Sequence, residues 1–162
     1  MTEKEMLLHV WEKEFPVTMK VLKAFPADQV DFKPHDRSRT AKALAWTIVT
    51  EEMMIGQATD GKVDYPGLPK APATFAEVLS TYETSHADMV AKVKKTSDKD
   101  LNSIMIDFMV GPKQPGKIKF SDFAWMLIMD SIHHRGQFSV YLRMAGGKVP
   151  SIYGPSADEP WF

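Results

Sequence analysis

The stretch SDFAWMLIMDSIHHRGQFSVYLRMAGG, from Ser121 to Gly147, has the pattern of one long helix. Its apolar residues recur every three or four positions, which is the repeat of a helix that packs one face against other elements. Ser121 is a residue type that caps helix N-termini, and a glycine pair followed by Pro150 is typical of a helix end. The sequence therefore predicts a helix from Asp122 to about Ala145, with Ser121 as its N-cap.

The inward face of this helix turns polar halfway along. A heptad assignment places these residues at inward positions: Phe123, Met126, Leu127, Asp130, His133, His134, Gln137, Val140, Tyr141 and Met144. Asp130 and His134 lie one turn apart on the same face, and Gln137 and Tyr141 continue the line. Because the other positions here are largely apolar, we expect this half of the helix to be buried on most sides. Its buried polar groups must then be paired.

Three further helices are predicted upstream. They run from Thr2 through Leu22, from about Ala41 to Ile55, and from Phe75 to about Lys95. The first and third open with a T-x-x-E capping box, at Thr2 and Thr74 respectively. Pro16 should bend the first helix, because proline removes an internal hydrogen bond and crowds the preceding turn. The second helix should stop near Gly56.

The segment from Thr96 to Phe120 has no helical repeat. An apolar run, Ile104 to Val110, is followed by the turn-rich stretch GPKQPGK, which is compatible with a loop or a short hairpin. We predict it to be irregular. Four helices joined by connections of unequal length indicate an all-α chain: one domain, residues 1–162, forming a four-helix bundle with a long crossover connection.

The second helix offers a polar counterpart to the last one. Its inward stripe reads Leu44, Thr47, Ile48, Glu51, Met54 and Ile55, so Thr47 and Glu51 interrupt an apolar face. If the two helices meet there, both side chains would share a pocket with Asp130 and His134, and such oxygen and imidazole groups can bind a divalent metal. A structural hydrogen-bonded network explains the same spacing, and Glu51, next to Glu52, could equally face solvent.

We interpret the other histidines and the two arginines of the last helix as structural residues. His86, like His9 and His35, has no paired ligand pattern and is interpreted as an ordinary surface or helix-face residue. Arg135 and Arg143 are expected to anchor the C-terminal tail or a neighbouring helix.

Composition excludes several classes of function. The chain carries 20 basic and 21 acidic side chains, a formal net charge of -1, so no excess charge favours nucleic acid or an anionic membrane. The absence of cysteine rules out disulfides, thiolate metal sites and a cysteine nucleophile. The N-terminal MTEKEMLLHVWEKEF lacks the pattern of a signal peptide, and no stretch has the length of a membrane span. We therefore expect a cytoplasmic protein.

The segment IHHRGQFSVYLRMAGGKVPSIYGPSADEPW, Ile132 to Trp161, closely resembles the C-terminal part of DinB/YfiT-like proteins. LAWTIVTEE, Leu44 to Glu52, resembles the second helix of the same family. The resemblance implies a four-helix bundle, commonly a homodimer, with zinc or nickel held by three histidines. Here His134 matches one of these ligands, whereas Asp130 and Thr47 stand where the other two histidines are expected, so Glu51 or water would have to complete the site.

Two functions follow from the resemblance. The first is a DinB-like stress- or damage-associated protein whose divalent-metal site is altered or vestigial, including a metal-free form in which Thr47, Asp130 and His134 make a closed hydrogen-bonded network. The alternative is a metal-dependent thiol S-transferase or isomerase that joins a small-molecule thiol to a small electrophile. In that enzyme Gln137 and Tyr141 would orient the ligand.

Overall fold

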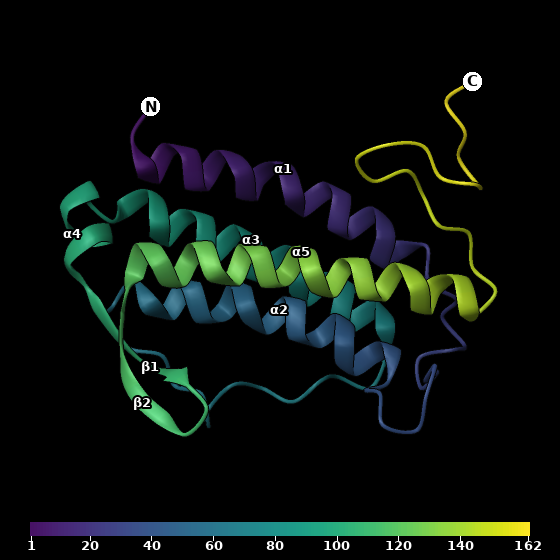
Figure 1. Cartoon of the computed structure of the whole chain (residues 1–162), viewed down its shortest axis with the longest axis horizontal. Helices are drawn as coiled ribbons and strands as arrows, with labels where there is room; N and C mark the ends of the chain where they lie inside the picture. Colours follow the sequence, from purple (N-terminus) through teal and green to yellow (C-terminus); the bar gives the residue numbers. More distant parts are fainter.

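The computed structural model describes all residues from Met1 to Phe162. Its elements, in chain order, are α1 (Glu3–Lys23), α2 (Ala41–Ala58), α3 (Phe75–Lys95), α4 (Asp98–Ser103), β1 (Met105–Gly111), β2 (Gln114–Lys119) and α5 (Phe120–Met144) (Figure 1). The four long helices α1, α2, α3 and α5 lie along one another and form the bundle. None of the helices combines the length and the apolar character needed to cross a bilayer.

The order of the helices around the bundle requires a long crossover. Helices α1 and α2 each pack against both α3 and α5, so the first two helices of the chain lie on a diagonal. The connection of residues 24–40 spans that diagonal, which confirms the predicted crossover. As a result α2 and α5, far apart in sequence, lie side by side.

The two predicted capping boxes are confirmed. Thr2 and Thr74 form complete capping boxes with Glu5 and Glu77, in which each threonine side chain accepts from the backbone N–H three residues later. Such reciprocal bonds satisfy N–H groups that have no partner within the helix. Helix α2 continues beyond the predicted stop at Gly56, because this glycine is buried against α3 within the last turn.

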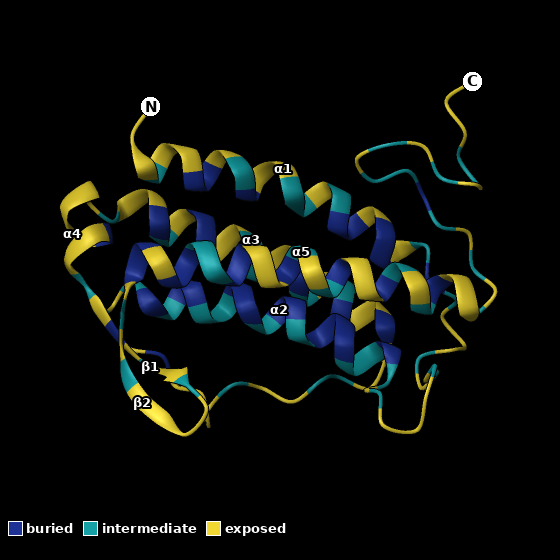
Figure 2. Cartoon of the chain, in the orientation of Figure 1, coloured by how far each residue is buried: buried dark blue, intermediate teal, exposed yellow.

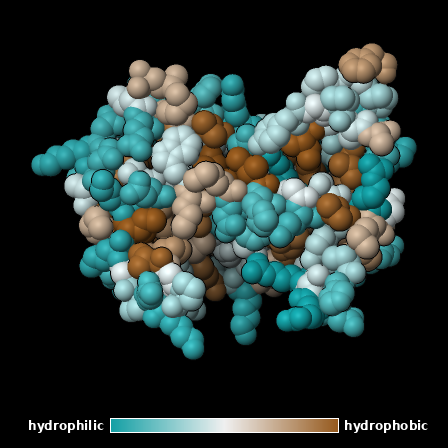
Figure 3. All heavy atoms as spheres, viewed as in Figure 1, coloured by the Kyte–Doolittle hydropathy of each residue, from teal (hydrophilic) through white to brown (hydrophobic).

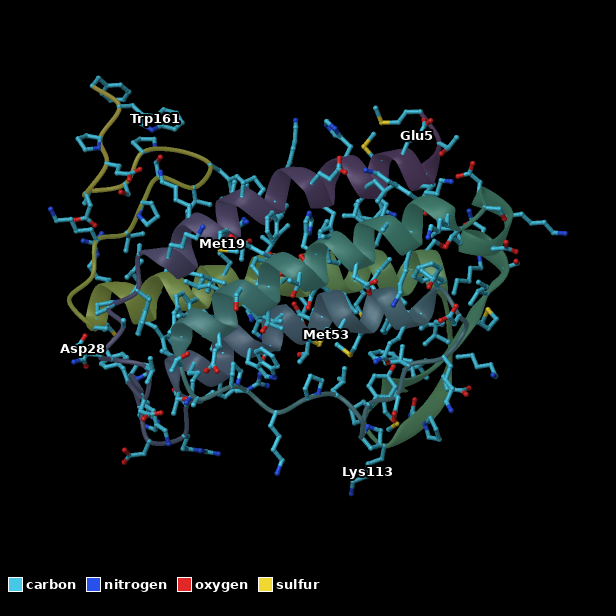
Figure 4. The ribbon with its side chains drawn as sticks, turned by 180° about the vertical axis from the view of Figure 1, so that it is seen from behind. Glu5, Met19, Asp28, Met53, Lys113 and Trp161 are labelled. Carbon is cyan, nitrogen blue, oxygen red and sulfur yellow. The ribbon has the colours of Figure 1, made fainter.

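The prediction of an irregular segment at 96–120 is wrong. The segment forms α4 and an antiparallel hairpin in which Ile106 pairs with Ile118 (Figure 1). Leu101 of α4 and Ile106 of β1 are fully buried and anchor this unit on the bundle. The chain is therefore mostly helical rather than purely α. Figure 4 labels Lys113 at the hairpin turn and Trp161 in the C-terminal tail, at opposite ends of the bundle.

The start of α5 also differs from the prediction. The N-cap is Lys119, which makes no side-chain cap bond, and the helix begins at Phe120. Ser121 lies inside the helix, is buried, and donates its hydroxyl to Asn102 Oδ1 over 3.2 Å. The hairpin sets this start, because β2 runs directly into the helix and Phe120 is fully buried.

Helix α5 is rotated relative to the predicted heptad. Its buried residues are Phe120, Ser121, Phe123, Ala124, Leu127, Ile128, Ser131, Arg135, Phe138 and Leu142. The predicted inward positions Asp130, His133 and Gln137 are exposed, so α5 has a solvent face throughout and the expectation of burial on most sides is wrong (Figure 2). The prediction failed because the buried face of α5 includes Arg135, and a pattern based on hydrophobicity assigns an arginine to the solvent face.

Arg135 is tolerated in the interior because its guanidinium bonds a carboxylate and two hydroxyls. Its guanidinium donates to Glu14 Oε2 over 2.5 Å and to Thr18 Oγ1 over 3.1 Å, both on α1, and to the Tyr153 hydroxyl of the tail. Arg143 forms an ion pair with Asp158 at 2.7 Å. Both arginines therefore hold the C-terminal tail against the bundle, as predicted.

Candidate metal centre and adjoining cavity

Three side chains from α2 and α5 converge at one point. Glu51 lies on α2, and Asp130 and His134 lie one turn apart on α5, so the packing of the two helices brings them together. His134 Nδ1 is 3.2 Å from Glu51 Oε1 and 3.6 Å from Asp130 Oδ1. One potential ligand atom from each residue falls within 4.8 Å of the others. Two carboxylates and an imidazole at this spacing are a donor set for a divalent cation.

The site runs from the bundle interior to its surface. The Glu51 side chain is 1% exposed, His134 is 12% exposed and Asp130 is 48% exposed. Glu51, which could have faced solvent on sequence grounds, thus lies at the inner end of the site. Asp130 lies at its outer end, where an incoming ion or ligand can reach it.

The inner end of the site has unsatisfied polar atoms. Both carboxylate oxygens of Glu51 and Nδ1 of His134 are buried without a hydrogen bond of ordinary geometry, and they are the only such side-chain atoms in the chain. A buried polar atom without a partner costs roughly 1–3 kcal/mol, and more when it is charged. His134 Nδ1 and Glu51 Oε1 face each other at 3.2 Å without ordinary hydrogen-bond geometry, and a cation between the two side chains would satisfy all three atoms.

The pKa values of Glu51 and His134 are both raised. Burial raises the pKa of Glu51 to about 7, although the neighbouring His134 opposes the shift. The Glu51 carboxylate in turn raises the pKa of His134, against the effect of burial. Near neutral pH the pair therefore holds protons that a metal would displace, because a metal binds carboxylate and neutral imidazole.

Thr47 takes a different place from the one expected. Its hydroxyl donates to the Ala43 carbonyl over 3.1 Å and accepts from Arg39 Nη1 over 2.7 Å. The Thr47 hydroxyl is thus occupied by a carbonyl on one side and a guanidinium on the other. The structure brings together Glu51, Asp130 and His134, and it leaves Thr47 to hold Arg39.

A cavity of about 490 Å³ opens beside His134. Its lining consists of Arg37, Ser38, Arg39, Leu44, His134, Gln137, Val140 and Tyr141. Gln137 and Tyr141, predicted to contact a ligand, both line it, and the Tyr141 hydroxyl donates to the Arg39 carbonyl over 3.3 Å. Sequence reasoning missed Arg37 and Arg39. The available signal was the DRSRT stretch, which places two arginines immediately before the cap of α2.

Glu52 belongs to a separate buried cluster on the opposite side of α2. It is 1% exposed, accepts from Trp11 Nε1 over 2.8 Å, and lies 3.0 Å from Nδ1 of His86. His86 also stacks on Phe15 with ring centroids 3.8 Å apart. The interpretation of His86 as an ordinary surface or helix-face residue is therefore wrong. Adjacent helical residues point about 100° apart, which is why Glu51 and Glu52 serve different clusters.

Fold and site together define a class: a helical bundle with a carboxylate–imidazole centre between two neighbouring helices. The DinB family model matches residues 1–161, and the chain belongs to the DinB family. The uncharacterised protein YrdA of Bacillus subtilis is 29% identical over 154 residues, which cover 94% of this chain and 89% of YrdA.

Solved structures of DinB-like proteins share the fold. A DinB-like protein from Bacillus cereus superposes with a TM-score of 0.75 at 28% identity, covering 92% of this chain and 97% of the other. YfiT from Bacillus subtilis, described as a probable metal-dependent hydrolase with an unusual four-helix bundle topology, superposes with a TM-score of 0.70 at 13% identity. The match to YfiT covers 90% of this chain and 89% of YfiT. At this level of identity, the match shows that the two chains share a fold.

Proposed function

We propose that this DinB-family chain is a divalent-metal-dependent protein that uses an altered ligand set, Glu51, Asp130 and His134. The observation that carries the proposal is the group of three buried, unpartnered atoms on Glu51 and His134. Asp130 takes the place of one histidine that the family resemblance implies, and Glu51 replaces Thr47 as the ligand from α2. The site is altered rather than vestigial, because a lost site would be expected to close its hydrogen bonds internally.

The ligand types favour a different metal from that of a three-histidine site. Two carboxylates and one imidazole are a harder donor set than three imidazoles, which shifts preference toward ions such as Mn²⁺ and away from nitrogen-based zinc or nickel binding. When bound, such a cation supplies Lewis-acid polarisation to a small molecule in the adjoining cavity.

The chain's own residues would position that small molecule. Gln137 and Tyr141 line the cavity next to His134 and present an amide and a phenol ring to it. Leu44 and Val140 supply apolar contact area. This arrangement suits activation of a nucleophile, a small thiol or water, toward a small electrophile, which is a chemistry appropriate to a stress-associated protein. The description of YfiT as a probable metal-dependent hydrolase is in keeping with this chemistry.

A metal-free role is the second candidate. It is favoured by the closeness of His134 to two carboxylates, since a protonated imidazole would neutralise part of their charge. The closed network envisaged from the sequence also needs Thr47, whose hydroxyl is bonded to Arg39 and Ala43 instead. The unpartnered atoms on Glu51 and His134 weigh further against a closed network.

Metal analysis of the chain purified without a histidine tag separates the two candidates. After exposure to a panel of divalent ions and removal of excess, mass spectrometry should find about one equivalent in the native chain and almost none in His134→Ala. The matched control is His133→Ala, which removes the neighbouring exposed histidine and should retain the metal. Negligible metal in the native chain and both variants would refute the proposal.

We also propose that the chain is a homodimer. Met129, Val140 and Met144 are large apolar side chains exposed on α5, and the face of the molecule seen in Figure 3 has apolar side chains between polar ones. Light scattering should give twice the mass of the 18.3 kDa chain for the native protein and the monomer mass for Met129→Glu. The control Met109→Glu, on the hairpin, should stay dimeric. A native monomer would contradict this assembly.

A further inference from the structure

Two arginines line the cavity beside the candidate metal centre. Arg37 and Arg39 both come from the connection that crosses from α1 to α2. The arginines that form salt bridges in this chain are Arg135 and Arg143, whereas Arg37 and Arg39 have no carboxylate partner. Two exposed guanidinium groups thus border the same hollow, and neither forms a salt bridge.

Arg39 is held in position by contacts on both sides. Its Nη1 donates to Thr47 Oγ1 over 2.7 Å, and its carbonyl accepts from the Tyr141 hydroxyl over 3.3 Å. Because the Thr47 hydroxyl hydrogen is directed to the Ala43 carbonyl, its lone pair faces the guanidinium. A guanidinium carries five N–H donors, so most of them remain free for a ligand. The bond to Thr47 restrains the exposed Arg39 side chain, so part of the conformational entropy that binding costs is already lost in the free protein.

The cavity lining as a whole favours negative charge. None of its eight residues is acidic, and besides the two arginines it offers the imidazole of His134, the amide of Gln137 and the hydroxyl of Ser38. The nearby carboxylates of Glu51 and Asp130 are committed to the metal if the proposed function holds. An oxyanion is the group that a pair of guanidinium donors recognises best, because their planar geometry matches carboxylate and phosphate oxygens.

We propose that this cavity binds a small molecule that carries a carboxylate or phosphate group, and that Arg37 and Arg39 hold this group. Thr47 is the positioning residue for Arg39. The volume of about 490 Å³ lies within the range of small-molecule sites. This inference rests on the proposed function in one respect: the opposite end of the bound molecule would lie at His134, next to the metal. The substrate class is therefore an anionic small molecule whose reactive group is distant from its charged group.

Titration calorimetry with inorganic phosphate and, separately, succinate tests this assignment on the metal-loaded chain and on the same chain after chelation. Arg37→Gln and Arg39→Gln should each weaken binding of at least one of the two anions by about tenfold, the loss expected for one charge-assisted contact. Thr47→Val should weaken it several-fold, whereas Thr47→Ser, which keeps the hydroxyl, should not. Lys13→Gln removes an exposed charge on α1 and serves as the control for net charge. Circular dichroism checks that each variant folds.

The outcomes separate this inference from the metal proposal. Equal affinity in the native chain and both arginine variants, or no binding of either anion, would overturn the arginine site whatever the metal content. Arginine-dependent binding that survives chelation would support the anion site, even in a chain that metal analysis finds empty. If binding is lost on chelation but is unchanged by the arginine substitutions, the anion contacts the metal alone, which also overturns this inference.

Discussion

Replacement of Glu51 by glutamine should stabilise the metal-free chain at alkaline pH and abolish its stabilisation by metal. Burial raises the pKa of Glu51 from its ordinary value of 4.5 to about 7. Between these values the folded chain binds more protons than the unfolded chain, so the free energy of unfolding falls as pH rises through this window. Above it, the native chain carries the full penalty of a buried carboxylate. Glutamine has nearly the same shape and no charge to bury.

The size of the effect follows from the shift. A displacement of this extent corresponds to about 3 kcal/mol at about pH 8, where Glu51 is ionised in both states. This value already includes the favourable effect of the neighbouring His134 on the carboxylate. For a chain of this length, a gain of about 3 kcal/mol raises Tm by about 6–12 °C. Below about pH 4 the carboxyl is protonated in both the folded and the unfolded chain, and the two proteins should have similar stability.

Urea unfolding followed by circular dichroism measures both effects. With chelator at about pH 8, Glu51→Gln should unfold at a higher urea concentration than the native chain. At about a hundred times its dissociation constant, a metal should stabilise the native chain by about 2.7 kcal/mol and the variant by far less. Glu52→Gln is the matched control, because it alters the neighbouring buried glutamate on the other side of α2 and should keep the metal response.

Two results would refute this reasoning. If Glu51→Gln in chelator is less stable than the native chain at alkaline pH, the Glu51 carboxylate is satisfied by the protein and its burial carries no penalty. If the variant gains as much stability from metal as the native chain does, Glu51 is not a ligand. Equal responses of the Glu51 and Glu52 variants would place the metal elsewhere.

Two further predictions concern the scaffold. Arg135→Met should lower the free energy of unfolding by about 2–4 kcal/mol, because it leaves the largely buried Glu14 without its cation. Arg143→Met, which breaks a more exposed pair, should cost at most about 1 kcal/mol in the same urea titration. Ile106→Ala should lower it by about 2–4 kcal/mol in calorimetry, since Ile106 is fully buried under the hairpin. Met109→Ala, on the exposed side, should change it by about 0.5 kcal/mol or less. Equal effects within either pair would contradict the assigned burial.

Local features of the chain predicted the helices well. The capping boxes at Thr2 and Thr74 and the apolar repeats of the four long helices act between residues three or four apart, so they can be read from the sequence. The Asp130–His134 pair is of the same kind, because a four-residue spacing places both side chains on one helix face. The sequence left a loop and a short hairpin open, and the irregular structure was preferred because the second strand, QPGKIK, has little of the composition of a strand.

The candidate site depends on contacts that no local pattern contains. The rotation of α5 was mispredicted because its buried face includes Arg135, whose partners lie on α1 and in the tail. Only the packing of α2 against α5 shows that Glu51, and not Thr47, lies beside His134. Thr47 instead bonds Arg39, which belongs to the irregular connection before α2. Side-chain spacing along α5 predicted Asp130 and His134, and the stripe of α2 offered both Glu51 and Thr47 as candidates. The packing of distant segments decided that Glu51 joins the centre and placed the arginines beside it, because burial and charge compensation are properties of the whole fold.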